Sequence, residues 1–202
     1  YQGEPSSQED LEKIPMLTRA DISREIAPIY NEEMKIADIP TVFHEIETNG
    51  IGYLDLMFDL SDVPEKDLPM VGLLQAVLGI IDTEHYEYGE LFNEINRHTG
   101  GIETSLELYP DVMKVKEKEF KATFEIKGKA LYGQIPFAIR MMKEILTASK
   151  LDDEKRLKEI LSMTKTRLQD RFLSAGHSAA ALRAMSYKSP ISKFKDTTNG
   201  IG

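Results

Sequence analysis

The feature that most constrains the fold is a turn followed by an alternating apolar stretch, at residues 48–60. The turn, Asn49-Gly50, is a strong hairpin signal because both residues tolerate the positive φ angles that a type I′ turn demands. The apolar residues that follow are Ile51, Tyr53, Leu54, Leu56, Phe58 and Leu60. Such a pattern is typical of a half-buried strand. Because the residues before the turn alternate as well, we predict two antiparallel strands, about 41–48 and 51–60, meeting at Asn49-Gly50.

The rest of the chain predicts further helices and one more hairpin. The run 70–81 is almost wholly apolar, which indicates a helix buried on nearly all sides. The other predicted elements are a helix at 88–97, a hairpin of strands at 102–109 and 114–127 that Gly128 ends, and helices at about 136–146, 152–173 and 177–185. Pro190 is predicted to end the last helical segment, and residues 197–202 to form a polar, turn-rich tail. This order, β-β-α-α-β-β-α-α-α, predicts an α+β domain with an antiparallel or mixed sheet and helices packed on one face.

Composition excludes several classes of function. The net charge of −9 argues against a general nucleic-acid surface, which needs basic clusters. The absence of Cys excludes disulfides and thiolate zinc sites and fits a reducing compartment. No apolar run approaches the roughly 18–20 residues of a membrane span. We therefore expect neither nucleic acid nor a membrane as a partner, and a cytoplasmic location, with an organelle as the alternative.

The chain divides into an arm and a domain. Residues 1–38 have few candidate core positions, with short helices expected near 10–13 and 18–26, and we predict a linker arm there. Residues 39–202 are predicted to form the α+β domain. Because the chain begins with Tyr1 rather than Met, we expect it to be a piece of a longer polypeptide.

Candidate catalytic and metal-binding residues are scattered. The histidines, His44, His85, His98 and His177, include no pair at i, i+4 helical spacing. His85 with Glu84 and Glu87 could be imagined as a metal site, and Asp55 with Asp59 as a carboxylate pair on one strand face. Glu94, Arg97 and His98 share a helix face and give a third possible enzyme site. For each set, solvated or structural roles are the favoured interpretation.

Three passages carry a family resemblance. They are residues 48–59 at the predicted hairpin, residues 94–102 ending in Gly100-Gly101, and residues 175–184, which begin Ala-Gly-His-Ser. In these passages the chain resembles the pitrilysin/insulinase superfamily of zinc peptidases, in its presequence-protease-like branch. The likeness covers nearly the whole chain. It implies the metallohydrolase-like fold of that superfamily, possibly truncated, and a place at the opening of the non-catalytic C-terminal half of such an enzyme.

The active half of this superfamily carries a zinc motif, His-x-x-Glu-His, on the helix after its first hairpin. The resemblance matches that motif to Gly72, Leu73, Leu74, Gln75 and Ala76, and no His or Glu lies between Met70 and Ile81. It therefore implies no cofactor and no catalytic residue in this chain. Zinc and the general base are expected in the N-terminal half of the parent enzyme.

The resemblance also implies a function. We expect a non-catalytic domain that forms part of the substrate chamber of a zinc-dependent metalloendopeptidase, with the N-terminal catalytic half and extended peptides as partners. In active halves, the strand after the Gly-rich turn is an edge to which substrate adds by main-chain pairing. The matching residues are Ile102, Glu103, Thr104 and Ser105. The alternative is a stand-alone interaction or structural protein with a degenerate peptidase fold.

Overall fold

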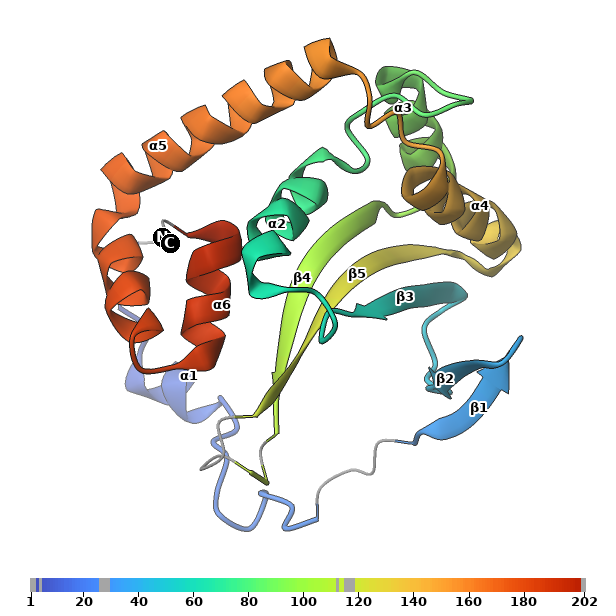
Figure 1. The fold of residues 1–202 in the computed structure, drawn as a ribbon. Coiled ribbons are helices and arrows are strands. Elements are labelled where there is room, and N and C mark those ends of the chain that lie inside the picture. The colour runs from blue at the N-terminus through green and yellow to red at the C-terminus, as the bar shows by residue number, and fades with distance from the viewer. Residues whose placement is uncertain (1–2, 4, 26–29, 112, 115–118, 201–202) are drawn as a thin grey trace. The chain divides into compact units, whose positions relative to one another are not determined.

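A computed structural model describes residues 3, 5–25, 30–111, 113–114 and 119–200 of the chain (Figure 1). It divides into two compact units, residues 1–47 and 48–202. The fold is α+β with two antiparallel sheets, which confirms the predicted class.

The first unit contains a short helix and a two-stranded hairpin. Helix α1 (Gln8–Glu12) is capped by the Ser7 side chain, which accepts from the Asp10 amide. Strands β1 (Glu32–Ile36) and β2 (Ile39–Phe43) pair across a two-residue turn with positive φ angles. The helix predicted at 18–26 is wrong for residues 18–25, which form turns and bends, and Ile26 lies outside the described residues.

The first strand of the hairpin predicted around Asn49-Gly50, residues 41–48, is wrong. Residues 44–48 are not in a strand, and β2 pairs with β1 instead. Both turn residues have the predicted positive φ angles, 52° and 82°, and strand β3 (Ile51–Asp59) follows them as expected. The turn signal was correct, but a second two-residue turn at Ala37-Asp38 gives β2 a partner nearer in sequence.

The second unit is built on a three-stranded antiparallel sheet in the order β3-β5-β4. Strands β4 (Ile102–Pro110) and β5 (Phe120–Leu131) form the second predicted hairpin, which is confirmed. Strand β5 runs past Gly128, so the predicted end of the hairpin is wrong. Residues 115–118 of the predicted strand lie outside the described residues.

The helices of this unit match the predicted residue ranges closely in the middle of the chain and less closely at its end. The elements are η1 (Glu65–Asp67), α2 (Leu68–Val77), α3 (Tyr88–His98), η3 (Tyr132–Gln134), α4 (Ile135–Thr147), α5 (Glu154–Ser186) and α6 (Pro190–Asn199). Helix α2 ends four residues before the predicted Ile81, because Leu78 is extended and Gly79 has a φ of +85°. No helix in the described ranges has the length and apolarity needed to cross a membrane.

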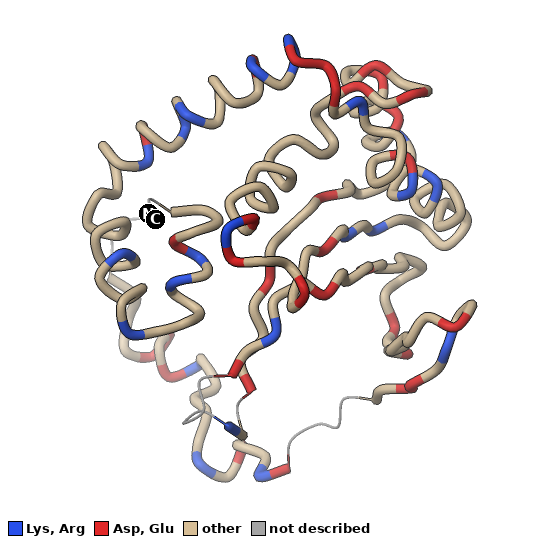
Figure 2. Tube along the Cα trace, viewed as in Figure 1, with Lys and Arg blue, Asp and Glu red and all other residues tan. Residues whose placement is uncertain are grey.

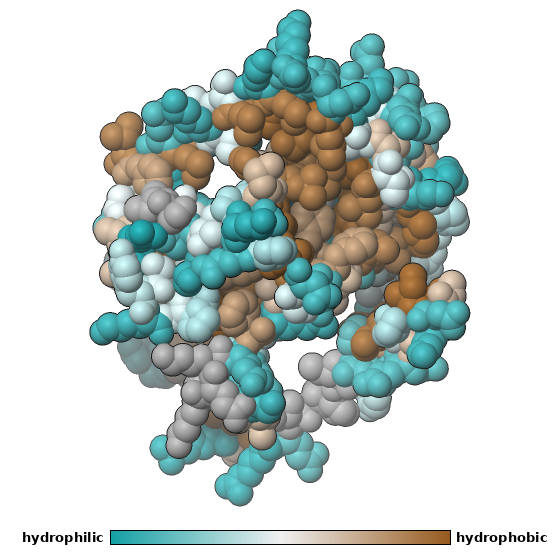
Figure 3. All heavy atoms as spheres, viewed as in Figure 1, coloured by the Kyte–Doolittle hydropathy of each residue, from teal (hydrophilic) through white to brown (hydrophobic). Residues whose placement is uncertain are grey.

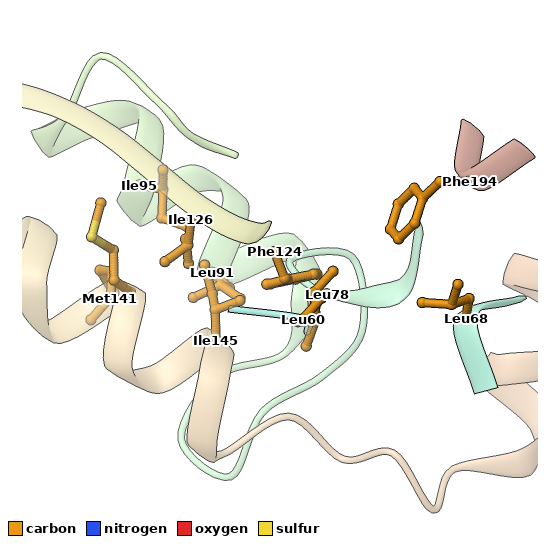
Figure 4. Packing of buried hydrophobic residues seen from close by; sticks show 11 residues of the cluster. Leu60, Leu68, Leu78, Leu91, Ile95, Phe124, Ile126, Met141, Ile145 and Phe194 are labelled. Atoms are coloured by element: carbon orange, nitrogen blue, oxygen red, sulfur yellow. The ribbon is translucent and has the colours of Figure 1, made fainter. Parts of the chain in front are cut away.

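Side chains from one face of β5 meet the helices in a common core. Figure 4 shows Phe124 and Ile126 of β5 beside Leu91 of α3 and Ile145 of α4. All four are buried, with exposed fractions of 6% or less. This packing fixes α3 and α4 on one face of the sheet, as the order of the predicted elements indicated.

Helix α2 is less buried than its apolar sequence predicts. Its buried residues are Leu68, Gly72 and Val77, whereas Met70 is 63% exposed. Figure 3 shows apolar surface gathered over α2 and the area next to it. The prediction of a helix buried on nearly all sides is therefore wrong, because the elements that pack on α2 in the described chain leave part of its surface open.

The C-terminal end also differs from prediction. A non-helical Ala175 kinks α5 between the helices predicted at 152–173 and 177–185, and the helix resumes at once. Helix α5 ends before Pro190, and Pro190 begins α6, a helix that was not predicted, since its missing N–H costs nothing at a first helical turn. Ser189 caps this helix by accepting from the Ser192 amide, and Phe194 is buried. The predicted turn-rich tail at 197–202 is wrong at residues 197–199, which belong to α6, and residues 201–202 lie outside the described residues.

Arg156 joins the start of α5 to two other elements. Its guanidinium donates to the Ile80 carbonyl at 2.8 and 3.3 Å and lies 3.8 Å from the centre of the Tyr88 ring. Replacing Arg156 with lysine keeps the charge but removes the paired N–H donors to the Ile80 carbonyl and the planar stacking on Tyr88. We therefore expect a loss of about 1–2 kcal/mol in the free energy of unfolding. Denaturant titration measures this loss. The matched Lys158→Ala change, which removes an exposed i,i+4 pair with Glu154, is expected to cost under about 0.5 kcal/mol.

Candidate functional site

Gly72 on α2, the position that matches the first zinc ligand of the family's motif, has no room for a side chain. A Cβ built on Gly72 would overlap the carbonyl oxygen of Thr198 on α6 and approach its carbonyl carbon to 3.1 Å. No side chain fits there without moving α6, least of all an imidazole. Because position 72 has no room and Gln75 and Ala76 bring no zinc donor of the family's kind, these residues do not fit the metal.

Gln75, matched to the general base, faces the sheet edge instead. Its Nε2 lies 3.4 Å from the Thr104 carbonyl oxygen, and the Thr104 hydroxyl donates to the Gln75 backbone carbonyl at 3.2 Å. These contacts join α2 to β4. The helix that would carry catalysis in an active half thus holds the neighbouring strand.

The predicted peptide-contact strand is an edge of the described sheet. The Lys129 amide donates to the Gly101 carbonyl at 3.4 Å, so odd-numbered positions of β4 face β5. The main-chain groups of even-numbered positions, Ile102 and Thr104 among them, point outward. Glu103 is exposed, Ile102 packs partly against the core, and the Ser105 hydroxyl is buried with no hydrogen-bond partner among the described residues.

A charged cluster lies on the sheet face opposite the α3–α4 core, which we call the polar face. The Glu125 side chain is fully buried there, and its carboxylate accepts from Tyr109 at 2.8 Å and from Thr123 at 2.5 Å. The Lys127 ammonium lies 2.8 Å from Glu125, 3.2 Å from Glu107 and 3.9 Å from Asp55. Figure 2 shows acidic and basic positions interleaved along these strands.

An alternating antiparallel hairpin commonly has one face in water, but Thr123 and Glu125 on the polar face are buried, with exposed fractions of 1% and 0%. The sequence signal available was only the alternation of Thr, Glu and Lys on β5. That alternation does not reveal that Tyr109, sixteen residues away, reaches across to the carboxylate.

Electrostatic effects follow from this crowding. Burial raises the pKa of Glu125, but hydrogen bonds from Lys127, Thr123 and Tyr109 outweigh it and leave that pKa below its usual value. Burial and the nearby Glu125 carboxylate raise the pKa of Asp55. Burial and the bond to Glu125 raise the pKa of Tyr109 to about 12. The hydrogen bond to Glu125 raises the pKa of Lys127 despite its desolvation. In this cluster, Lys127 is charged, and the pKa values of Asp55 and Glu125 are shifted in opposite directions.

His85, the suggested metal ligand, pairs with a residue that sequence spacing did not indicate. Its Nδ1 lies 3.0 Å from both Glu144 oxygens, and Glu144 lies on α4. Burial raises the pKa of Glu144, while Thr83 and His85 together hold it below its usual range. The pair fixes the loop before α3 to α4. Across the described ranges, no three His, Asp or Glu residues are grouped so that they could hold a metal ion.

The other candidates form surface pairs. Asp59 lies 3.3 Å from Lys121, and its bonds with the Ser61 hydroxyl and amide, together with Lys121, lower its pKa to about 2. On α3, Glu94 lies 2.7 Å from Arg97 and 3.6 Å from His98, whose ring stacks obliquely on Phe137. These three residues do come together, as ordinary helix-surface pairs. His44 and His177 are exposed.

The fold and the closed α2 position define an α+β domain that has no zinc motif on its first long helix. The chain belongs to the family described as Peptidase M16C associated, which matches residues 1–202. This membership confirms the resemblance to peptidases of the presequence-protease-like branch.

The chain is similar to Protein HypA of Clostridium perfringens, with 36% identity over 99% of this chain and 20% of the relative. It is 28% identical to Presequence protease 1, chloroplastic/mitochondrial, of Arabidopsis thaliana, over 89% of this chain and 16% of the relative. It is 26% identical to the mitochondrial presequence protease of Yarrowia lipolytica, over 96% and 19%. The chain thus spans about a fifth of the length of these relatives or less.

Proposed function

We propose that this chain is a non-catalytic domain of a zinc-dependent metalloendopeptidase that degrades peptides, and that it forms part of the substrate chamber wall. The observation that carries the proposal is the closed position at Gly72, where α6 fills the space a zinc-ligand side chain would need. Family membership and the presequence proteases among the relatives support it. The proposed partner is a zinc-bearing N-terminal half of the same polypeptide, and the proposed substrates are extended peptides. We propose a cytoplasmic location, with an organelle as the alternative that the relatives' names suggest.

Zinc binding and peptide cleavage, measured on the chain and on the full polypeptide, test this function. We expect the full polypeptide to bind stoichiometric zinc and to cleave a quenched, unstructured peptide, and residues 1–202 to do neither. Cleavage by residues 1–202 would overturn the proposal and make His85 and His98 the first residues to replace. A full polypeptide that neither binds zinc nor cleaves would overturn it as well.

The β4 edge is the proposed place of peptide contact, at Ile102, Glu103, Thr104 and Ser105. An extended peptide would bond the outward main-chain groups of this strand. The Gln75 amide already occupies the Thr104 carbonyl, so it competes with a peptide N–H for the same acceptor. In this proposal, a bound peptide displaces the Gln75 side chain from the Thr104 carbonyl.

Replacing Gln75 with alanine is expected to lower the KM of the full enzyme for an extended peptide by about threefold to tenfold, the worth of one hydrogen bond. Steady-state kinetics measure the change. The Gln169→Ala variant, on an exposed position of α5, is the matched control and is expected to leave KM unchanged. An unchanged KM in Gln75→Ala would count against peptide contact at this edge.

A further inference from the structure

Strand β3 forms the other edge of the described sheet. The Leu60 amide donates to the Ala122 carbonyl and the Tyr132 amide donates to the Gly50 carbonyl, both at 3.0 Å. Even-numbered positions along this stretch therefore face β5, and odd-numbered positions face away. The main-chain groups of Tyr53, Asp55 and Met57 point outward from the sheet. In the part of the chain that the structure describes, no strand pairs with them.

This edge lacks the protection that natural edges usually have. Leu56, Met57 and Phe58 are 38%, 51% and 45% exposed, and the nine-residue strand contains neither Pro nor Lys. Edge strands of stable proteins are normally short, charged with Lys, bulged or covered, because open edges aggregate. The β4 edge, by contrast, has its Thr104 carbonyl covered by Gln75. A long, unpaired edge with exposed apolar side chains indicates that another strand belongs beside it.

The two faces of β3 specify the chemistry of that strand. Leu56 and Phe58 lie opposite Ile126 and Phe124 in the register and so border the apolar core. A partner strand would bury these two side chains by placing apolar residues beside them. The partner's core-facing positions are therefore apolar.

The polar face requires the opposite character. Among the described residues, Asp55, Glu107 and Glu125 surround the single ammonium of Lys127, which leaves an excess of negative charge. Asp55 is the member of this cluster that stands on the β3 edge. A Lys or Arg on the partner strand, placed beside Asp55, would balance the charge. The partner strand thus alternates apolar and basic residues.

A second copy of this chain does not have that chemistry. Two β3 edges can pair antiparallel about a two-fold axis. If the axis lies at Asp55, that carboxylate faces Asp55 of the second copy. An axis at Met57 sets Asp55 against Asp59 of the other copy, and an axis at Leu56 sets it against Met57; because β3 contains no Lys or Arg, no such register places a basic side chain beside Asp55. Like charges directly opposite destabilise a sheet. The relatives are about five times as long as this chain. Polypeptide outside this chain is therefore a better source of the partner strand than a second copy.

We propose that the outer edge of β3 pairs with a strand from the polypeptide outside this chain, one that alternates apolar residues with Lys or Arg and places a basic side chain beside Asp55. Permanent pairing explains why the edge carries large apolar side chains, which a transient site would leave in water. The inference rests on the proposed place of this chain in a longer polypeptide. It does not depend on the peptide contact proposed for β4.

Residue-resolved amide hydrogen exchange tests this pairing in residues 1–202 and in the full polypeptide. We expect the amides of Tyr53, Asp55 and Met57 to exchange fast in residues 1–202 and roughly 100-fold more slowly in the full polypeptide. The amides of Leu54 and Leu56, which face β5, are the internal control and should be protected in both. Outward amides that exchange equally fast in both proteins would overturn the proposal. So would protection already present in residues 1–202, which would assign the edge to this chain or a second copy.

The charge requirement has its own test. In the full polypeptide, Asp55→Lys is expected to reduce the protection of the Met57 amide against exchange at least tenfold, and Asp55→Asn to reduce it by a smaller factor. Asp170→Lys, on an exposed position of α5, is the matched control and should leave β3 protection unchanged. Equal protection in all four proteins, the wild type included, would overturn a basic partner. Because exchange does not require zinc or cleavage, a failure of catalysis with intact protection would count against the proposed function alone.

Discussion

Replacing Gly72 with alanine is expected to lower the free energy of unfolding of residues 1–202 by about 3 kcal/mol, at the upper end of overpacking costs. The new methyl group would overlap the Thr198 carbonyl oxygen, which is backbone and cannot turn aside as a side chain could. Helix α6 would have to move away from α2 and draw buried Phe194 with it. Denaturant titration followed by circular dichroism measures the loss.

Gly89→Ala is the matched control, because Gly89 also lies within a helix and has no atom within 4 Å of an added Cβ. Alanine has the higher helix propensity, so this variant should gain about 0.5–1 kcal/mol in stability. Equal stabilities of the two variants would show that α6 does not close over Gly72. The structural support for a non-catalytic α2 would then be lost.

Much of the second unit could be predicted because its signals are local. The β4–β5 hairpin and helices α3 and α4 have alternating or helical periods that their own residues specify. The first strand of the predicted hairpin was wrong because the turn that joins β2 to its partner, Ala37-Asp38, is not a recognised hairpin sequence. Asn49-Gly50 and Ala37-Asp38 both adopt positive φ angles, and periodicity does not decide which neighbour β2 takes.

Contacts distant in sequence set the limits of the site prediction. Sequence identified the missing zinc motif at Gly72 and Gln75, but it did not show that Thr198 closes the first position or that Thr104 binds the second. Those contacts join residues 126 and 29 positions apart in the printed sequence. The buried Glu125 was missed for the same reason, since its partner Tyr109 lies on another strand. Family resemblance supplied the matched positions, and the structure supplied their surroundings.

Replacing Lys127 with methionine is the second change for which we expect a large effect. It removes the ammonium that Asp55, Glu107 and Glu125 share while keeping an unbranched apolar stem. Breaking a buried ion pair costs about 3–5 kcal/mol, and because Lys127 is 33% exposed we expect about 2 kcal/mol at pH 7. The Lys121→Met change, which removes an exposed partner of Asp59, is the control and should leave the free energy of unfolding nearly unchanged.

The pH dependence of this loss identifies its cause. In the wild type, the lowered pKa of Glu125 contributes stability above its unfolded value of 4.5, and that stability is lost as the pH falls through the folded pKa. Without Lys127, the pKa of each neighbouring carboxyl rises, so the folded variant takes up protons at a higher pH than the wild type does. The difference in unfolding free energy should therefore be largest near neutral pH and shrink as the pH falls toward about 4. Urea titrations of both proteins across this range measure it. A loss that stays constant with pH would instead assign the effect to lost packing of the lysine stem and would remove the charge excess on which the basic partner strand depends.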